Sequence, residues 1–248
     1  MDKTAAFLPG DLNLLARETD MLATTIASLA ADELPQPARR EGRTRADVLA
    51  QIVGAAHRAA AFMESAHTGD GPTGSDSSGG SGASGAGERG TETDAESAGL
   101  PAPQLKARVA DALDRVTRSA RELTTGVARE RLDGPGGALD AYWLPALWTT
   151  QAILLHDDLD TVWELEEADI TALEDAMEVI VARLVASPDS PLDARLLTAE
   201  GEEYTLGAGA PDVRGERYAL LSWLTGGKAA GVHAGGALPA SPRLLDLI

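Results

Sequence analysis

Hydrophobic residues in the first part of the chain recur at the three- and four-residue spacing of amphipathic helices. The first such segment starts at Asp11, whose side chain is suited to an N-cap. Its apolar face comprises Leu15, Leu22, Ile26 and Leu29. A second segment starts at Thr44, which stands with Asp47 at the spacing of a capping box and predicts a helix to about His67. Its apolar stripe comprises Val48, Ile52, Ala55, Ala59 and Phe62.

The stretch from 68 to 99 has a different composition. It is dominated by Gly, Ser, Thr and acidic residues and contains almost nothing apolar. Ordering such a segment would cost conformational entropy that no buried surface offsets. We therefore predict a disordered Gly/Ser-rich insert within the surrounding domain.

Two further helices are predicted after this insert. One follows Pro103 and is closed by Gly126, and the other runs from about Ala141 through Glu167 and is rich in Trp, Leu and Ile. The stripe of the first comprises Leu105, Val109, Leu113, Val116, Ala120 and Leu123. Each of the four helices has an apolar stripe that the others must cover. This favours an antiparallel four-helix bundle over residues 1–168.

The pattern changes after residue 168. Residues 169–186 have helical spacing, with Thr171 and Glu174 at the spacing of a capping box. The segment RLLTAEGEEYTL alternates around a Gly-containing turn as a β-hairpin does, and ERYALLSWLTGG resembles a short helix stopped by Gly226 and Gly227. The tail from Val232 is expected to add one edge strand. The predicted fold class is therefore α+β, a bundle followed by a small α+β domain over residues 169–248.

Charge and cysteine content narrow the range of partners. The chain of 248 residues has a formal net charge of -18. Such a chain is repelled by phosphate backbones and anionic lipid surfaces, which argues against nucleic acid and membrane partners. There is no cysteine, so disulfides and thiolate metal ligands are excluded. The sequence has no apolar signal core or spanning segment, so we expect a cytoplasmic protein.

Three stretches resemble the mycothiol-dependent maleylpyruvate isomerase family. They are TRADVLAQI (44–52), LPALWTTQAILLHDDLD (144–160) and YALLSWLTGG (218–227). They occur in the family's order and cover both predicted domains. The resemblance implies a DinB-like N-terminal bundle that binds a divalent metal such as zinc, together with mycothiol as the thiol cofactor. Abundant Ala, Gly and Arg also indicate a GC-rich genome, such as those of actinobacteria.

The residues that the resemblance marks as metal ligands are replaced in this chain. The family's histidine position in the first stretch is occupied by Gln51, and its usual tryptophan position, just before the stretch, is occupied by Arg43. In the second stretch, an alignment on Asp158 and Leu159 places Gln151 at the glutamate position and Leu155 at the histidine position. The arginine that commonly ends the third stretch is replaced by Gly227, which Lys228 follows.

These replacements predict a degenerate metal site. Leu155 has no lone pair to donate, and the neutral amides of Gln51 and Gln151 are poor zinc ligands. We expect no bound metal or cofactor and assign no catalytic residue. A relocated site built from His156, Asp158 and His57 is the alternative. It is disfavoured because His156 lies about 100° round the helix from the lost ligand position.

Three functions remain open at this point. The first is a family-like protein that binds mycothiol or another small thiol in the interdomain cleft and has little or no metal-dependent catalysis. The second is an active isomerase or thiol transferase with the relocated metal site. The third is a non-enzymatic module that binds a small molecule or a protein partner in the same cleft. A purely structural partner protein, with the Gly/Ser-rich insert as a tether, is a further alternative.

Overall fold

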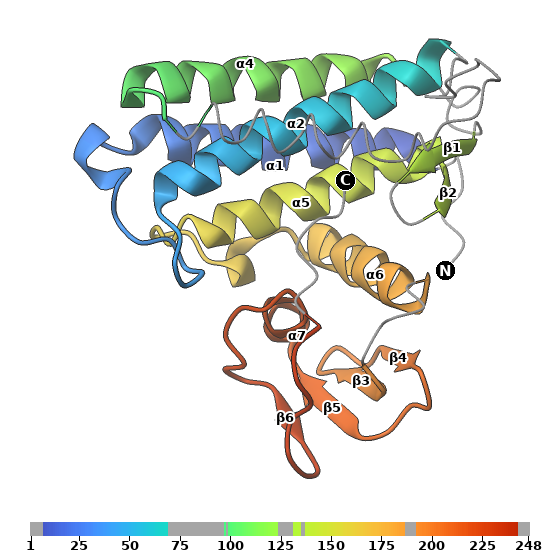
Figure 1. Cartoon of the computed structure of the whole chain (residues 1–248). Helices are drawn as coiled ribbons and strands as arrows, with labels where there is room; N and C mark the ends of the chain where they lie inside the picture. Colours follow the sequence, from blue (N-terminus) through green and yellow to red (C-terminus); the bar gives the residue numbers. More distant parts are fainter. Residues whose placement is uncertain are drawn as a thin grey trace, which may run out of the picture.

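The bundle and the small domain are both present. The computed structural model describes residues 7–68, 97, 99–123, 131–134, 137–186 and 192–242. Within these ranges, four long helices lie together, and a sheet with a short helix lies below them (Figure 1). The bundle helices are α1 (Leu8–Ser28), α2 (Arg45–Thr68), α4 (Ala102–Arg121) and α5 (Leu144–Asp158). A 3-10 turn, η1 (Ala31–Glu33), lies between α1 and α2.

The bundle helices run as two opposed pairs. Near the ends of α1 and α5, His156 and Thr25 are joined by a hydrogen bond of 2.7 Å, so these two helices run in the same direction. Lys106, near the start of α4, donates to the carbonyl of Leu29 just beyond the end of α1. α4 therefore runs opposite to α1, as α2 does (Figure 1).

The capping box predicted for α2 is confirmed. The backbone N–H of Thr44 donates to the carboxylate of Asp47 at 2.8 Å, and the N–H of Asp47 donates back to the Thr44 hydroxyl at 3.2 Å. The prediction that Asp11 caps α1 is wrong, because α1 begins at Leu8. Pro9 has the fixed φ that suits a first turn. Asp11 instead lies inside that turn, where a negative charge interacts favourably with the helix dipole.

The start of α6 (Ile170–Ala186) also differs from the prediction. Its first turn is capped by Asp169, whose carboxylate accepts the N–H of Thr171 at 2.8 Å. Thr171 therefore lies inside the helix and is not the N-cap of a box with Glu174. A carboxylate before the first turn provides the same acceptor as a hydroxyl. The predicted helix after Pro103 is α4. Gly126 and nearly all of the predicted disordered insert, residues 69–96 and 98, lie outside the described residues.

The prediction of one helix from Ala141 through Glu167 is wrong at both ends. A 3-10 turn, η3 (Ala141–Trp143), precedes α5, and α5 ends at Asp158. Asp160 then adopts a φ of 51°, which no right-handed helix contains. A further 3-10 turn, η4 (Leu165–Glu167), follows before α6. The sequence pattern stayed apolar through this region because Trp163, in the loop after α5, and Leu165, in η4, are both buried.

A hairpin before α5 was not predicted. β1 (Arg131–Gly134) pairs antiparallel with β2 (Gly137–Asp140). The segment DGPGG between and within these strands is a turn signal of the kind that joins hairpin strands. Its strands are too short to show alternation, which is why the sequence pattern did not reveal them.

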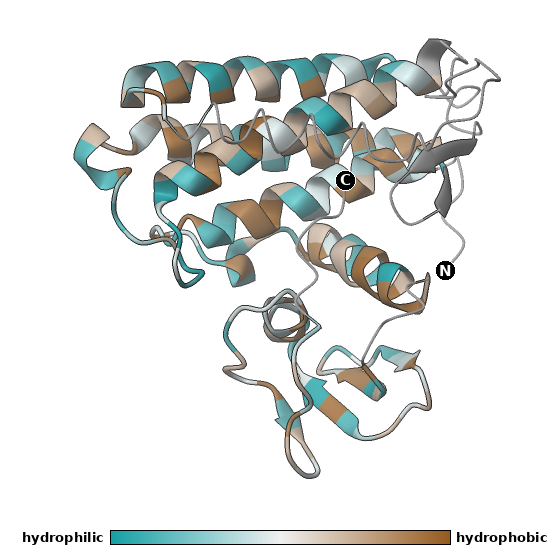
Figure 2. Ribbon diagram, in the orientation of Figure 1, coloured by the Kyte–Doolittle hydropathy of each residue, from teal (hydrophilic) through white to brown (hydrophobic). Residues whose placement is uncertain are grey.

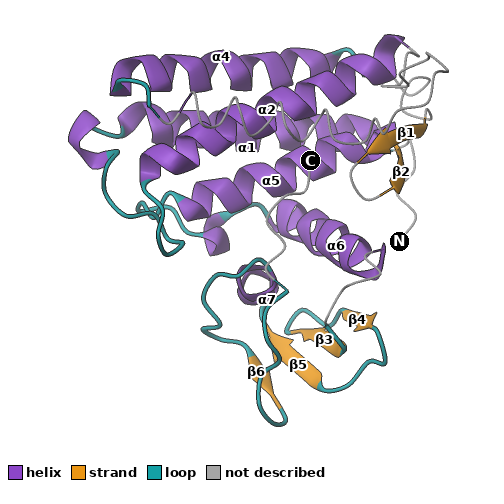
Figure 3. Cartoon of the chain, viewed as in Figure 1, coloured by secondary structure: helices purple, strands orange, loops and turns teal. Residues whose placement is uncertain are grey.

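The C-terminal region contains the predicted hairpin, short helix and edge strand. β3 (Ala194–Thr198) pairs with β4 (Glu203–Leu206), and α7 (Arg217–Leu224) ends before Gly226, which has a φ of 88°. The tail supplies β6 (His233–Ala234). One strand was missed, β5 (Asp212–Gly215), which lies parallel to β3 and completes the order β4-β3-β5-β6. The α+β fold class is confirmed (Figure 3).

One hydrophobic core extends through the bundle and into the sheet. Figure 2 shows many hydrophobic positions along α5 and α6, and residues of both helices belong to this core. α6 packs against α5 above and α7 below, so it links the two predicted domains. The boundary at residue 168 therefore stays a prediction. Within the described ranges, no helix is long and apolar enough to cross a membrane.

Candidate functional site

The three positions of the predicted degenerate metal site lie on the two helices that face each other inside the bundle. Gln51 is on α2, and Gln151 and Leu155 are one turn apart on α5, which packs against α2. Their exposures are 9%, 3% and 0%. All three side chains are thus interior, as ligands of a bundle metal would be. None of them supplies an imidazole or a carboxylate.

The side chain of Arg43, eight residues before Gln51 in the sequence, contacts the side chain of Gln51. Its Nη1 donates to the amide oxygen of Gln51 at 2.6 Å, and its Nη2 donates to the backbone carbonyl of Asp47 at 3.1 Å. The same Nη1 lies 3.6 Å from the carboxylate of Asp158. Gln51 therefore presents its oxygen to a fixed guanidinium. A divalent cation at that oxygen would be repelled by the positive charge of Arg43.

Asp158 lies in a cluster of arginines at the end of α5. Its side chain is 2% exposed, and Nε of Arg40 lies 3.3 Å from one carboxylate oxygen. Burial raises the pKa of Asp158 above its usual range, although the charges of Arg40 and Arg43 act in the opposite direction. Neither carboxylate oxygen has a hydrogen bond of good geometry in the described part of the chain. The carboxylate is held mainly by ion pairs, with the backbone of Arg40 as a weaker hydrogen-bond donor.

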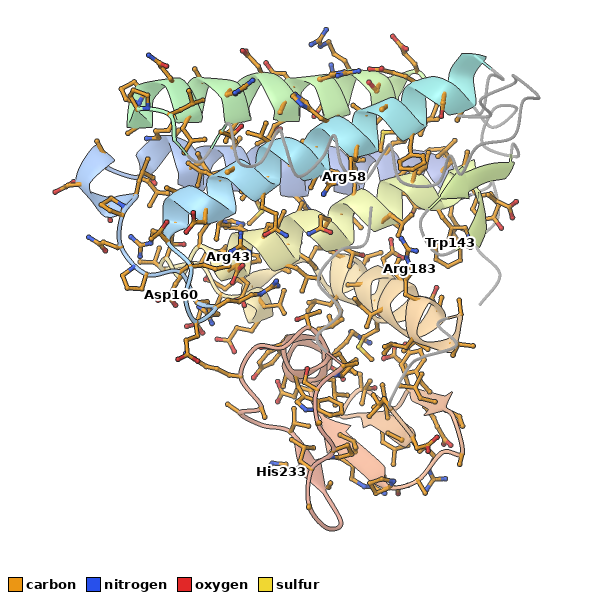
Figure 4. The ribbon with its side chains drawn as sticks, in the orientation of Figure 1. Arg43, Arg58, Trp143, Asp160, Arg183 and His233 are labelled. Carbon is orange, nitrogen blue, oxygen red and sulfur yellow. The ribbon has the colours of Figure 1, made fainter. Side chains whose placement is uncertain are left out.

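The arginines just before α2 and at its first position also cover the carbonyl end of α5. Arg45 donates to the backbone carbonyls of Leu159 and Asp160 at 2.8 and 2.6 Å. Arg39 lies 3.4 Å from the carboxylate of Asp157. Cations are favourable at a helix C-terminus because carbonyl groups are left without partners there. Figure 4 places Arg43 and Asp160 at this end of the bundle.

His156 faces the opposite side of α5, toward α1. Its Nε2 is hydrogen-bonded to the hydroxyl of Thr25 at 2.7 Å, and its ring stacks on Trp163 with centroids 3.9 Å apart and planes 3° apart. Burial lowers the pKa of His156 to about 4. The ring is thus neutral near pH 7 and is held in a specific orientation. It is a buried histidine in a satisfied environment.

His57 is placed on α2 against the arginines of α4. Burial lowers its pKa, and the nearby charges of Arg115 and Arg108 lower it further. The residues of the alternative metal site therefore lie in three environments. His156 faces α1, Asp158 faces Arg40, and His57 lies beside cations. The structure does not bring them together.

Gly227 stands where the resemblance implies an arginine. Its N–H donates to the carbonyl of Ser222 at 2.7 Å. A Cβ at this position would lie 2.9 Å from that carbonyl oxygen and 2.5 Å from the Ser222 hydroxyl. The local backbone thus has no room for a side chain unless it shifts, and the absence of the arginine is built into the turn after α7.

A pocket of ≈ 570 Å³ lies on the α1 side of the bundle. It is lined by residues of α1, by His156 of α5 and by Trp163 of the following loop, with no contribution from the C-terminal sheet. The interdomain cleft predicted from the sequence is therefore not where this pocket lies. Its α1 residues are Arg17, Asp20, Met21, Thr24 and Thr25.

The side chains inside the bundle differ from those of a metal site. Within the described residues, no group of three or more His, Asp or Glu side chains is arranged to hold a metal ion. The chain combines a four-helix bundle, in which α2 and α5 bury two amides and the guanidinium of Arg43 contacts one of them, with a small α+β domain.

Comparison with solved structures specifies the fold. The chain is similar to the crystal structure of the mycothiol-dependent maleylpyruvate isomerase, with a TM-score of 0.80 and 18% sequence identity over 97% of this chain and 99% of that one. It is equally similar to a histidine-to-alanine mutant of such an isomerase, with a TM-score of 0.78 and 18% identity. No family model and no curated protein matches the sequence. The likeness confirms the fold.

Two features of the site were not predicted from the sequence. One is the contact of Arg43 with Gln51 and Asp158, and the other is the pocket at Trp163. The first feature had a visible signal in the sequence, the four closely spaced arginines Arg39, Arg40, Arg43 and Arg45. Cations that become buried require acidic partners, so nearby carboxylates were to be expected. The pocket had no comparable signal, since Trp163 reads as a core residue in either case.

Proposed function

We propose that this chain uses the isomerase fold as a metal-independent small-molecule-binding protein, with little or no metal-dependent catalysis. The observation that supports this most directly is the 2.6 Å hydrogen bond from Arg43 to the amide oxygen of Gln51. An oxygen engaged by a guanidinium is a poor ligand for a second cation. Leu155 offers no donor atom at all, so two of the three positions fail for independent reasons.

The similar solved structures are of an enzyme that depends on mycothiol, which suggests a ligand class. A small thiol is the ligand we propose, bound beside Arg43 and Gln51 near the start of α2. Zinc lowers the pKa of a thiol that it coordinates, and a nearby guanidinium does so more weakly. Arg43 would therefore be the cation nearest to a thiol bound beside Gln51. Binding of the thiol without rapid chemistry is the expected behaviour.

A metal analysis tests the first part of this proposal. Protein produced in zinc-supplemented medium is expected to contain far less than one metal ion per chain, and added zinc should leave its thermal midpoint unchanged. Stoichiometric zinc, or a rise of the midpoint with zinc, would overturn the metal-free proposal.

Rebuilding the ligands provides a matched gain-of-function control. The triple variant Gln51→His, Gln151→Glu, Leu155→His is expected to bind one zinc ion per chain and to be stabilised by it. The double variant that keeps Leu155 lacks the third ligand and should bind zinc much more weakly. Addition of Arg43→Ala to the triple variant should strengthen zinc binding, because it removes the competing charge. A triple variant that folds but ignores zinc would contradict the assigned positions.

Calorimetry with mycothiol tests the ligand class. Metal-free wild-type chain is expected to bind the thiol, and Arg43→Ala to bind it more weakly. If folded, metal-free protein does not bind mycothiol, the thiol-binding proposal is rejected.

A further inference from the structure

The contact between Arg43 and Gln51 fixes which way the Gln51 amide faces. Arg43 donates to the amide oxygen of Gln51 at 2.6 Å. A guanidinium has donors but no acceptor, so the amide nitrogen of Gln51 must lie on the side away from Arg43. Gln51 therefore presents two N–H donors away from the guanidinium.

The Gln51 amide nitrogen remains able to bind a ligand. In the part of the chain that the structure describes, no acceptor takes its N–H groups, and it is not among the fully buried polar atoms that lack a partner. It is therefore in contact with solvent, although Gln51 as a whole is only 9% exposed. Arg43 is also accessible, because its side chain is 28% exposed. Both side chains can thus donate to a ligand near the start of α2.

The acceptors nearest to these donors are buried or already engaged. Both carboxylate oxygens of Asp158 are fully buried. Oδ2 of Asp47 accepts the N–H and the hydroxyl of Thr44, at 2.8 and 2.7 Å, and the Asp47 carbonyl accepts Nη2 of Arg43. N–H donors and a positive charge are therefore the main groups that a ligand beside Gln51 would meet. Such groups favour an anion, because hydrogen bonds to a charged acceptor are the stronger ones.

We infer that the site binds a small thiol as its thiolate, with the amide N–H of Gln51 and the guanidinium of Arg43 donating to the sulfur. On binding, the S–H bond breaks, its electron pair stays on the sulfur and the proton leaves to solvent. Arg43 then provides a fixed positive charge beside the sulfur. This inference rests on the proposed thiol binding. It adds the ionised form of the ligand, a binding role for Gln51 and a dependence of affinity on pH.

The linkage between binding and ionisation gives the size of this dependence. A free thiol has a pKa of about 8.5, and a neighbouring arginine lowers the pKa of a thiol by about one unit or more. A shift of one unit means that the thiolate binds about ten-fold more tightly than the thiol. The affinity should therefore rise about eight-fold between pH 6 and pH 9.

The charged groups around the site do not produce such a rise themselves. Asp47 and Asp158 face Arg43 from α2 and α5, and Arg40 faces Asp158 from the connection before α2. Hydrogen bonds from Thr44 lower the pKa of Asp47, so this carboxylate is ionised throughout the range, and arginine stays charged. Burial raises the pKa of Asp158. Any charge that Asp158 gains as the pH rises would repel an anion and weaken its binding, which is the opposite trend.

Calorimetric titration of the full, metal-free chain at several pH values tests the inference. Mycothiol is expected to bind about eight-fold more tightly at pH 9 than at pH 6. The difference spectrum of the complex should also show thiolate absorbance at pH values where free mycothiol is mostly protonated. S-Methylmycothiol is the matched ligand control, because it has no S–H to lose and its affinity should not rise with pH.

The outcomes separate this inference from the thiol proposal. If mycothiol binds with an affinity that is independent of pH, or that follows S-methylmycothiol, the thiolate inference is overturned and thiol binding stands. If mycothiol does not bind at any pH, both are rejected.

Variants assign the effect to the two donors. Arg43→Gln keeps N–H donors and removes the charge, so the rise in affinity with pH should fall to about two-fold or less, whereas Arg43→Lys should keep most of it. Gln51→Leu removes the amide N–H and should weaken mycothiol more than S-methylmycothiol. Arg214→Gln removes a 64% exposed arginine from the sheet and should change neither ligand. An unchanged pH dependence in both Arg43→Gln and Gln51→Leu would place the thiol elsewhere and reject the inference.

Discussion

The two sides of α5 bury polar groups in different ways. Toward α1, Trp148 donates to the hydroxyl of Thr19 at 2.9 Å, and His156 is bonded to Thr25. These pairs are neutral, and their hydrogen bonds are made. Toward α2 and its preceding connection, Asp158 faces Arg40 and Arg43 through ion pairs of 3.3 and 3.6 Å without well-formed hydrogen bonds.

The difference predicts which side contributes more to stability. A neutral pair with complete hydrogen bonds costs little to bury, whereas a buried carboxylate regains its hydration energy only if its hydrogen bonds are complete. The charged side is the one on which the sequence resemblance predicted metal ligands. In this chain the charge there is organised as an arginine cluster. The α1 side should therefore dominate stability, and the two sides should respond to acid in opposite directions.

The largest expected effect comes from Trp148 on the neutral side. Its side chain is fully buried, so Trp148→Ala removes a large apolar surface and leaves a cavity. We expect a loss of about 4 kcal/mol in the free energy of unfolding, measured by urea denaturation. Trp148→Phe should lose less, because it keeps part of the ring. Val162, which is 98% exposed, provides a control, since Val162→Ala should change the free energy by less than about 0.5 kcal/mol. Similar losses in Trp148→Ala and Val162→Ala would contradict the packing described for α5.

Acid should destabilise the neutral side through His156. The pKa of this ring is about 4 in the folded chain and 6.5 when unfolded, so the unfolded state takes up the proton first as the pH falls. The stability contributed by the neutral ring is complete above pH 6.5 and is lost down to pH 4, by at most about 3 kcal/mol. His156→Gln has no such group and should lack this part of the loss. The check is a comparison of unfolding free energies at several pH values, and parallel profiles for the two proteins would reject the assignment.

Helix positions were predictable from the sequence, but their ends and the site contacts were only partly so. The stripe from Val48 to Phe62 predicted α2, because periodic burial is a local property of the chain. The end of α5 was missed, because the apolar pattern continues through Trp163 and Leu165 beyond the helix. The break itself is marked by the positive φ of Asp160, which the sequence does not reveal. β5 was missed, because its pairing with β3 is parallel and joins distant segments.

The candidate site was also only partly predictable from the sequence. Gln51, Gln151 and Leu155 were located in the interior from the resemblance alone, and their burial agrees with that placement. The contact of Arg43 with Gln51 was not foreseen. It depends on how the connection before α2 folds back over α5, where Arg39 donates its N–H to the carbonyl of Asp158. Such a tertiary contact has no period in the sequence.

The smallest expected effect tests the charged side. Burial raises the pKa of Asp158, so the folded state holds its proton more tightly than the unfolded state does. The ionised carboxylate therefore opposes folding at high pH, and this penalty is relieved as the pH falls through the raised folded pKa. Asp158→Asn keeps the shape and removes the charge, and Arg40 and Arg43, which are 15% and 28% exposed, keep contact with solvent when they lose this partner. The raised pKa of Asp158 therefore predicts a small stabilisation of the chain at pH 8, of less than about 1 kcal/mol.

The advantage of Asp158→Asn over the wild-type chain should shrink as the pH falls below the raised pKa of Asp158, which is the opposite trend to that of His156. Asp160→Asn is the matched control, because Asp160 is a 48% exposed partner of Arg39 and Asn tolerates its positive φ. Its effect on stability should stay within about 0.5 kcal/mol at any pH. If Asp158→Asn instead destabilises the chain at pH 8, the ion pairs with Arg40 and Arg43 outweigh the burial of the charge, and the two sides of α5 are alike in stability.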